Sequence, residues 1–86
     1  MIVKEEHLKI LVHCGLHGRV AVNLAEIALD KKVDLLISAG GRQVNCSSIL
    51  ELLSLGLAQG SQIKVRVEGE QAPAAMQAVR DLLVNE

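Results

Sequence analysis

The sequence predicts an α+β fold: a two-layer, open-faced sandwich in the order βαββαβα, with a four-stranded antiparallel sheet and three helices on one face. Apolar and polar residues alternate in four short stretches, as in strands with one buried face. Two longer stretches place apolar residues at helical spacing, and a capping pattern marks a third, short helix. Polar strand positions should face water, which an antiparallel sheet permits; they include Asp34, Ser38, Lys64 and Arg66.

The first strand and the first helix are predicted within residues 8–30. Leu8, Ile10 and Val12 alternate with polar neighbours, Leu11 excepted, and this pattern predicts a strand over residues 8–12. Gly15 then interrupts the alternation. From about residue 18 to residue 30 the apolar residues recur at helical spacing, which predicts an amphipathic helix.

A hairpin and the short helix are predicted next. Residues 33–39 and 42–46 form its two strands, because the Gly40-Gly41 pair between them readily adopts the positive φ angles of a tight turn. Ser48 and Glu51 form a capping-box pattern, in which a serine oxygen and a glutamate satisfy free backbone donors at a helix start. This helix should end near residues 55–56.

The C-terminal part of the sequence predicts one strand and one helix. Residues 62–68 alternate strictly between polar and apolar, and Gly69 ends the strand. Pro73 suits the first turn of a helix. The buried stripe of that helix is expected to consist of Ala72, Ala75, Met76, Val79 and Leu83.

Length and composition restrict the class of protein. The length of 86 residues allows a single domain, residues 1–86, with one core. That core is expected to be aliphatic, because the chain has no Phe, Tyr or Trp. A net charge of −1 and the lack of stacking rings argue against nucleic-acid binding. We find no signal peptide and no apolar run that could insert into a membrane, so we expect a cytoplasmic domain whose Cys14 and Cys46 are free thiols.

The most informative segment for function contains His17, between a predicted strand and the start of a helix. A helix start presents unpaired N–H groups that favour an anion, and a neutral imidazole can act as a nucleophile. Arg19 could donate to phosphoryl oxygens. The segment therefore suits a phosphoryl group held on His17. A histidine that merely caps the helix beside an exposed arginine would give the same local sequence.

Several motifs, in order and spacing, resemble those of HPr, the histidine phosphocarrier of the bacterial sugar phosphotransferase system. The active-site pattern Gly-Leu-His-x-Arg-Pro reads Gly15-Leu16-His17-Gly18-Arg19-Val20 here. The regulatory pattern Val-Asn-x-Lys-Ser reads Val44-Asn45-Cys46-Ser47-Ser48. The stretch Ser54-Leu55-Gly56-Leu57-Ala58-Gln59-Gly60 and the strand end Glu68-Gly69-Glu70 also match. The resemblance covers essentially the whole domain.

The resemblance implies a role for each matching residue. His17 would accept a phosphoryl group through Nδ1, charged from phosphoenolpyruvate by enzyme I, and pass it to the IIA components of sugar permeases. Arg19 and the backbone amide of Gly18 would stabilise that group, and no cofactor or metal would be needed. Ser48 matches the serine that a dedicated kinase modifies in many Gram-positive relatives. Partners would dock on an apolar surface formed by Leu16, Ile49, Leu50 and Leu53.

The sequence also departs from the family pattern. Val20 replaces the family proline, so we expect a less rigid helix start. Positions where the family carries lysines around its histidine hold Glu26, Leu29, Ser47 and Glu51 instead. The loss of this basic rim should weaken steering toward an acidic partner or select a different one.

Two alternatives to the carrier follow from these features. One is an HPr-like regulatory module that binds a transcription factor or an enzyme, with or without phosphorylation of Ser48 by a serine kinase. The other is a metal site at His13, Cys14 and His17, to which His7 could add, because His7 and His13 are predicted to share a strand face. The spacing of these residues fits structural zinc sites poorly, so partly exposed side chains are the favoured interpretation.

Overall fold

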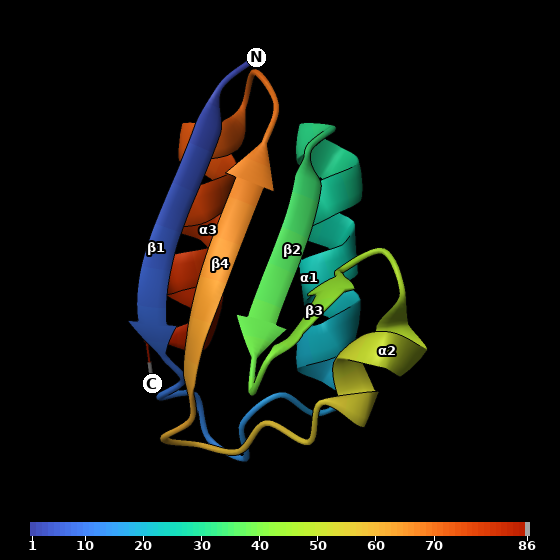
Figure 1. Ribbon diagram of the computed structural model, residues 1–86, viewed down its shortest axis with the longest axis vertical. Coiled ribbons are helices and arrows are strands. Elements are labelled where there is room, and N and C mark those ends of the chain that lie inside the picture. Colours follow the sequence, from blue (N-terminus) through green and yellow to red (C-terminus); the bar gives the residue numbers. More distant parts are fainter. Residues whose placement is uncertain (86) are drawn as a thin grey trace.

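The computed structural model describes residues 1–85 and has the predicted order of elements. The strands are β1 (Val3–Lys9), β2 (Asp34–Ala39), β3 (Arg42–Asn45) and β4 (Gln62–Glu68). The helices are α1 (Gly18–Lys31), α2 (Ile49–Ser54) and α3 (Ala72–Leu83). Figure 1 shows this arrangement with the sheet in front and the two long helices behind it.

All pairings in the sheet are antiparallel, and the strand order is β1-β4-β2-β3. β4, the last strand in sequence, therefore lies inside the sheet between the first strand and the hairpin. Gly40 and Gly41 join β2 to β3 with φ angles of 57° and 80°, as the hairpin prediction requires. β1 and β3 are left as the two edges.

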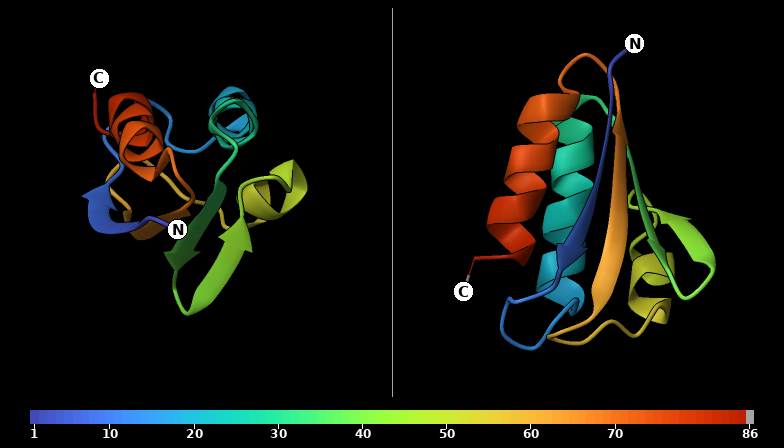
Figure 2. Two further views of the ribbon diagram at one scale, coloured as in Figure 1. Left: turned by 90° about the horizontal axis from the view of Figure 1, so that it is seen from above. Right: turned by 60° about the vertical axis from the view of Figure 1, so that its left-hand side comes forward.

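The helices cover one face of the sheet, and the other face is open. Viewed from above, α1 and α3 lie side by side, and the short α2 lies beyond α1, next to β3 (Figure 2). None of the helices in residues 1–85 combines the length and apolarity needed to span a membrane.

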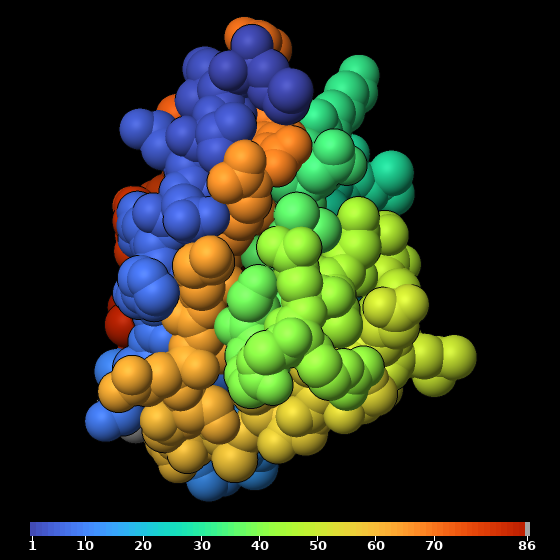
Figure 3. Space-filling model, in the orientation of Figure 1, coloured from blue at the N-terminus to red at the C-terminus, as the bar shows by residue number. Residues whose placement is uncertain are grey.

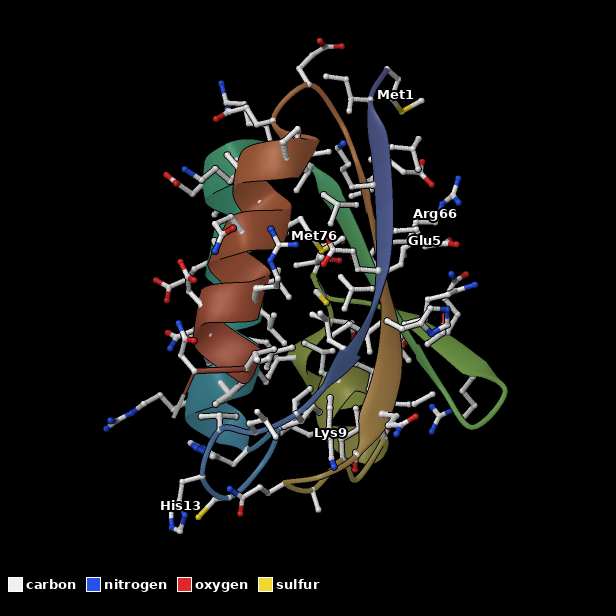
Figure 4. The ribbon with its side chains drawn as sticks, turned by 90° about the vertical axis from the view of Figure 1, so that its left-hand side faces the viewer. Met1, Glu5, Lys9, His13, Arg66 and Met76 are labelled. Carbon is white, nitrogen blue, oxygen red and sulfur yellow. The ribbon has the colours of Figure 1, made fainter. Side chains whose placement is uncertain are left out.

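The core between sheet and helices is aliphatic, as predicted. The predicted stripe of α3 is buried at all five positions, and Met76 lies between this helix and the sheet (Figure 4). Alternate residues of β4 and β2 belong to the same buried cluster as this stripe, among them Val65, Val67 and Leu35. Both cysteines are free thiols, with Cys46 in the core and Cys14 exposed.

The first strand differs from its prediction. We predicted residues 8–12, whereas β1 spans Val3–Lys9. The first half of β1 consists largely of charged residues, which the alternation of apolar and polar residues could not reveal as a strand. These charges are accommodated because Glu6 pairs with Arg80 of α3 on one face and Glu5 pairs with Arg66 on the other. After Lys9 the chain turns away, so His13 lies in a loop and does not share a strand face with His7, contrary to the prediction.

Candidate functional site

His17 occupies the position immediately before α1 and caps that helix. Its backbone is extended, with φ −99° and ψ −175°, and its imidazole Nδ1 accepts a hydrogen bond from the Arg19 N–H at 3.3 Å. Because an acceptor nitrogen carries a lone pair, the proton of the neutral ring sits on Nε2. The exposed ring therefore directs the Nδ1 lone pair toward the free N–H groups of the helix start.

The loop before His17 is held against residues 57 and 58. Cys14 and Gly15 both have φ angles of 67°, in the left-handed region. A Cβ at Gly15 would lie 2.6 Å from both the Leu57 carbonyl oxygen and Ala58 Cα, so only glycine fits. The Leu16 N–H donates to the same Leu57 carbonyl at 3.0 Å. Gly15 lies beyond the end of β1, so its role in the structure is to let the loop approach residues 57 and 58 and not to interrupt a strand.

A second set of contacts ties the same loop to the end of α3. The N–H groups of Leu11 and Val12 donate to the Leu83 carbonyl at 2.8 Å and 3.0 Å, and Gln59 Nε2 donates to the Leu11 carbonyl at 2.9 Å. Two segments distant in sequence, residues 57–59 and the end of α3, therefore fix the path that leads to His17. These contacts could not be predicted from residue types, because most of them join backbone groups that nearly every residue possesses.

Residues on both sides of His17 anchor it in the core. Leu16 is 5% exposed and Val20 is 3% exposed, so the exposed imidazole stands between two buried side chains. Val20 replaces the family proline with an apolar contact. Leu16, which we predicted to take part in docking, is buried, because the turn at Gly15 directs that leucine inward.

Gly18 and Arg19 complete the exposed part of the helix start. A Cβ at Gly18 would meet nothing within 4 Å, so the space above this backbone is open to an approaching group. The Arg19 guanidinium is exposed and makes no ion pair within residues 1–85. It is therefore available to an anion bound near His17.

The other predicted docking residues lie on α2 with graded exposure. Leu50 is 81% exposed, Leu53 is 39% exposed, and Ile49 is half-buried against the core. The expectation that a short helix leaves at least one of Ile49 and Leu50 exposed is confirmed. α2 contacts α1 and lies beside the N-terminal part of that helix (Figure 1), so the exposed leucines belong to an element next to the start of the first helix.

Ser48 caps α2, and only half of the predicted capping box forms. Its Oγ accepts from the Glu51 N–H at 3.4 Å. The Ser48 N–H donates to the Asn45 carbonyl at 3.0 Å instead of to the Glu51 carboxylate. That carboxylate is therefore free of the cap, on an exposed residue one turn from the Ser48 hydroxyl.

None of the four positions where the family carries lysines holds a basic residue, which leaves Arg19 as the exposed cation next to His17. Glu26 and Leu29 on α1 and Ser47 and Glu51 around α2 are all exposed. His13 lies in the loop at one end of the molecule (Figure 4). Among residues 1–85 no three His, Cys, Asp or Glu side chains come together as metal ligands would.

An open-faced sandwich with an exposed histidine at a helix start defines a class of small carrier domain, and the comparisons specify it. The family model "PTS HPr component phosphorylation site" matches residues 4–85. The phosphocarrier protein HPr of Xylella fastidiosa is 35% identical over 81 residues, which cover 94% of this chain and 91% of the relative.

Solved structures agree with the sequence matches. HPr from Bacillus anthracis superposes with a TM-score of 0.88 at 26% identity, covering 96% of this chain and 99% of that one. HPr-C-His from Thermoanaerobacter tengcongensis gives a TM-score of 0.85 at 31% identity, covering 94% and 91%. The chain belongs to the HPr family of phosphocarriers of the phosphotransferase system.

Proposed function

We propose that this chain carries a phosphoryl group on His17, received from phosphoenolpyruvate through enzyme I and delivered to the IIA components of sugar permeases. The observation that carries the proposal is the hydrogen bond from the Arg19 N–H to His17 Nδ1, at the start of a 14-residue helix. It holds the ring so that the nucleophilic lone pair faces backbone donors. The chemistry belongs in the cytoplasm, where these partners would meet the carrier.

The transfer would proceed at Nδ1 with the residues already in place. The Nδ1 lone pair forms a bond to phosphorus while the bond between phosphorus and the donor breaks, and Nε2 keeps its proton. The phosphoryl oxygens then replace Nδ1 as acceptors for the helix-start N–H groups of Gly18 and Arg19. The Arg19 guanidinium adds charge-assisted hydrogen bonds, and transfer to the acceptor reverses these steps.

The exposed leucines of α2 would provide the contact with partners. Leu50 and Leu53 present apolar surface near the helix start that bears His17. Enzyme I and a IIA protein would each bury this surface while bringing a phosphoryl donor or acceptor to Nδ1. One docking surface used in turn by two partners suits a carrier that has no catalytic cycle of its own.

The decisive experiment is phosphorylation by the cognate enzyme I with phosphoenolpyruvate. We expect one acid-labile phosphoryl group per chain, detected by mass and by ³¹P NMR, and none on His17→Ala. His13→Ala is the matched control, because it removes an exposed imidazole from the same loop and should leave labelling intact. Label that persists in a folded His17→Ala protein, or none on the unaltered chain, would contradict the carrier.

A regulatory role is a second candidate, favoured by the exposed Glu26 and Glu51 where a basic rim would serve an acidic enzyme I. A transcription factor or an enzyme would then bind this side of the molecule, with binding unchanged in His17→Ala.

Phosphorylation of Ser48 by a serine kinase and its removal by a phosphorylase could modulate such binding. The Glu51 carboxylate would repel that phosphate. Kinase labelling lost in Ser48→Ala and kept in Ser47→Ala would support this modification.

A further inference from the structure

The face of the sheet that the helices leave open contains a groove with a volume of about 530 Å³. Its walls come from the end of β1, the start of β4 and the hairpin between β2 and β3. Figure 3 looks onto this face, with β1 in blue, β4 in orange and the hairpin in green around the hollow. The groove contains no residue of the His17 loop, so it is separate from the proposed carrier site.

The strand register gathers nitrogen donors in this groove. His7 is the direct cross-strand partner of Lys64, and Lys64 is the direct partner of Ser38, so the three form one row across three strands. The next row pairs Lys9 with Gln62. Directly opposite side chains on one face have Cβ atoms about 5 Å apart. These five polar side chains all line the groove, and no carboxylate does.

The charges of this face are separated along the strands. Away from the groove, Arg66 Nε donates to Glu68 Oε2 at 2.6 Å, and Arg66 Nη1 lies 3.2 Å from Glu5 Oε2 (Figure 4). The same Glu5 oxygen lies 3.8 Å from Lys64 Nζ, beyond hydrogen-bond distance. Lys9 makes no ion pair within residues 1–85. The positive charge of Lys9 therefore remains unpaired in the groove, and that of Lys64 is paired, within the same residues, only with Glu5, which Arg66 shares.

We propose that this groove binds a small organic phosphate. A phosphomonoester brings up to two negative charges and three acceptor oxygens, which match Lys9, Lys64 and His7. The volume falls within the range of small-molecule sites and exceeds the size of one phosphate group, so the ligand has a polar body as well. That body would meet the Ser38 hydroxyl, the Gln62 amide and the backbone of the Gly40-Gly41 turn.

The test is an NMR titration of the ¹⁵N-labelled chain with ribose 5-phosphate at constant ionic strength, alongside inorganic phosphate and ribose. We expect saturable shifts at the groove residues with ribose 5-phosphate, weaker ones with inorganic phosphate and none with ribose. Lys9→Gln and Lys64→Gln should each weaken binding by about threefold. Glu5→Gln should tighten it by about threefold, because it releases Lys64 from its only ion-pair partner in residues 1–85.

Lys4→Gln is the matched control, since Lys4 lies on the same strand but points to the other face and is not part of the groove. It should leave the affinity unchanged. The proposal is overturned if the shifts do not saturate, if they are confined to residues 17–19, if inorganic phosphate binds as tightly, or if Lys4→Gln weakens binding as much as the groove variants do.

Discussion

Gly15 shows how a single residue without a side chain determines the position of the candidate nucleophile two residues later. Its left-handed backbone and its approach to Leu57 and Ala58 are both incompatible with a Cβ. The turn it permits sends Leu16 into the core and leaves His17 outside. Gly18, three residues further on, is unconstrained by its neighbours, so the two glycines of this segment have opposite roles.

Gly15→Ala should therefore destabilise the fold by about 2–4 kcal/mol, through left-handed strain and a clash with backbone atoms that cannot move away. Gly18→Ala should change the free energy of unfolding by no more than about 1 kcal/mol, on the stabilising side, because alanine suits a helix better. Urea unfolding followed by circular dichroism measures both. Equal effects of the two substitutions would refute this account of Gly15.

The two cysteines should differ sharply in reactivity. Burial raises the pKa of the Cys46 thiol to about 12, whereas Cys14 is exposed in the His17 loop. Because the thiolate is the reactive form, a thiol reagent at neutral pH should label Cys14 alone in the native protein and both residues in denaturant. Mass spectrometry of the native chain and of Cys14→Ser provides the count. Rapid labelling of native Cys14→Ser would show that Cys46 is not protected.

At the scale of elements, the short helix α2 has two distinct sides. Leu52 is fully buried, while Leu50, two positions earlier, projects into solvent. A helix of six residues cannot bury every side, so it contributes both to the core and to the proposed docking surface. Stability and partner binding can therefore be separated within this one element.

Leu52→Ala should cost about 3 kcal/mol of folding free energy, because it opens a cavity in the core. Leu50→Ala should alter stability by less than about 0.5 kcal/mol and slow phosphoryl transfer from enzyme I at least about fivefold, because an exposed apolar anchor is lost. Thermal unfolding and single-turnover transfer distinguish the two effects. Unchanged transfer in Leu50→Ala would remove this leucine from the docking surface.

Across the whole molecule, helices and strands were predicted best from the sequence where one face of the element is buried and the other is exposed to solvent. α3 and β4 meet this condition, and their buried positions follow the helical and alternating patterns residue by residue. β1 does not, because ion pairs on both of its faces replace the alternation in its first half. Its length is set by pairing with β4, which the β1 sequence alone does not encode.

For the candidate site, the sequence predicted which residues take part but not the backbone conformation and contacts that position them. The His17 segment, Ser48 and the leucines of α2 stood out by residue type and spacing. The inward turn of Leu16 did not, because a buried and an exposed leucine look alike in sequence. Nor did the support from the Leu57 and Leu83 carbonyls, since backbone acceptors leave no residue signature.

The purely aliphatic core also has a practical consequence. Without tryptophan or tyrosine the chain emits no background fluorescence in the near ultraviolet, so one introduced indole would report on its own surroundings alone. Leu53→Trp would place such a probe on α2, at a position that is already partly exposed. With a partner added, quenching or a blue shift of this emission, measured against the partner alone, would follow each encounter in real time.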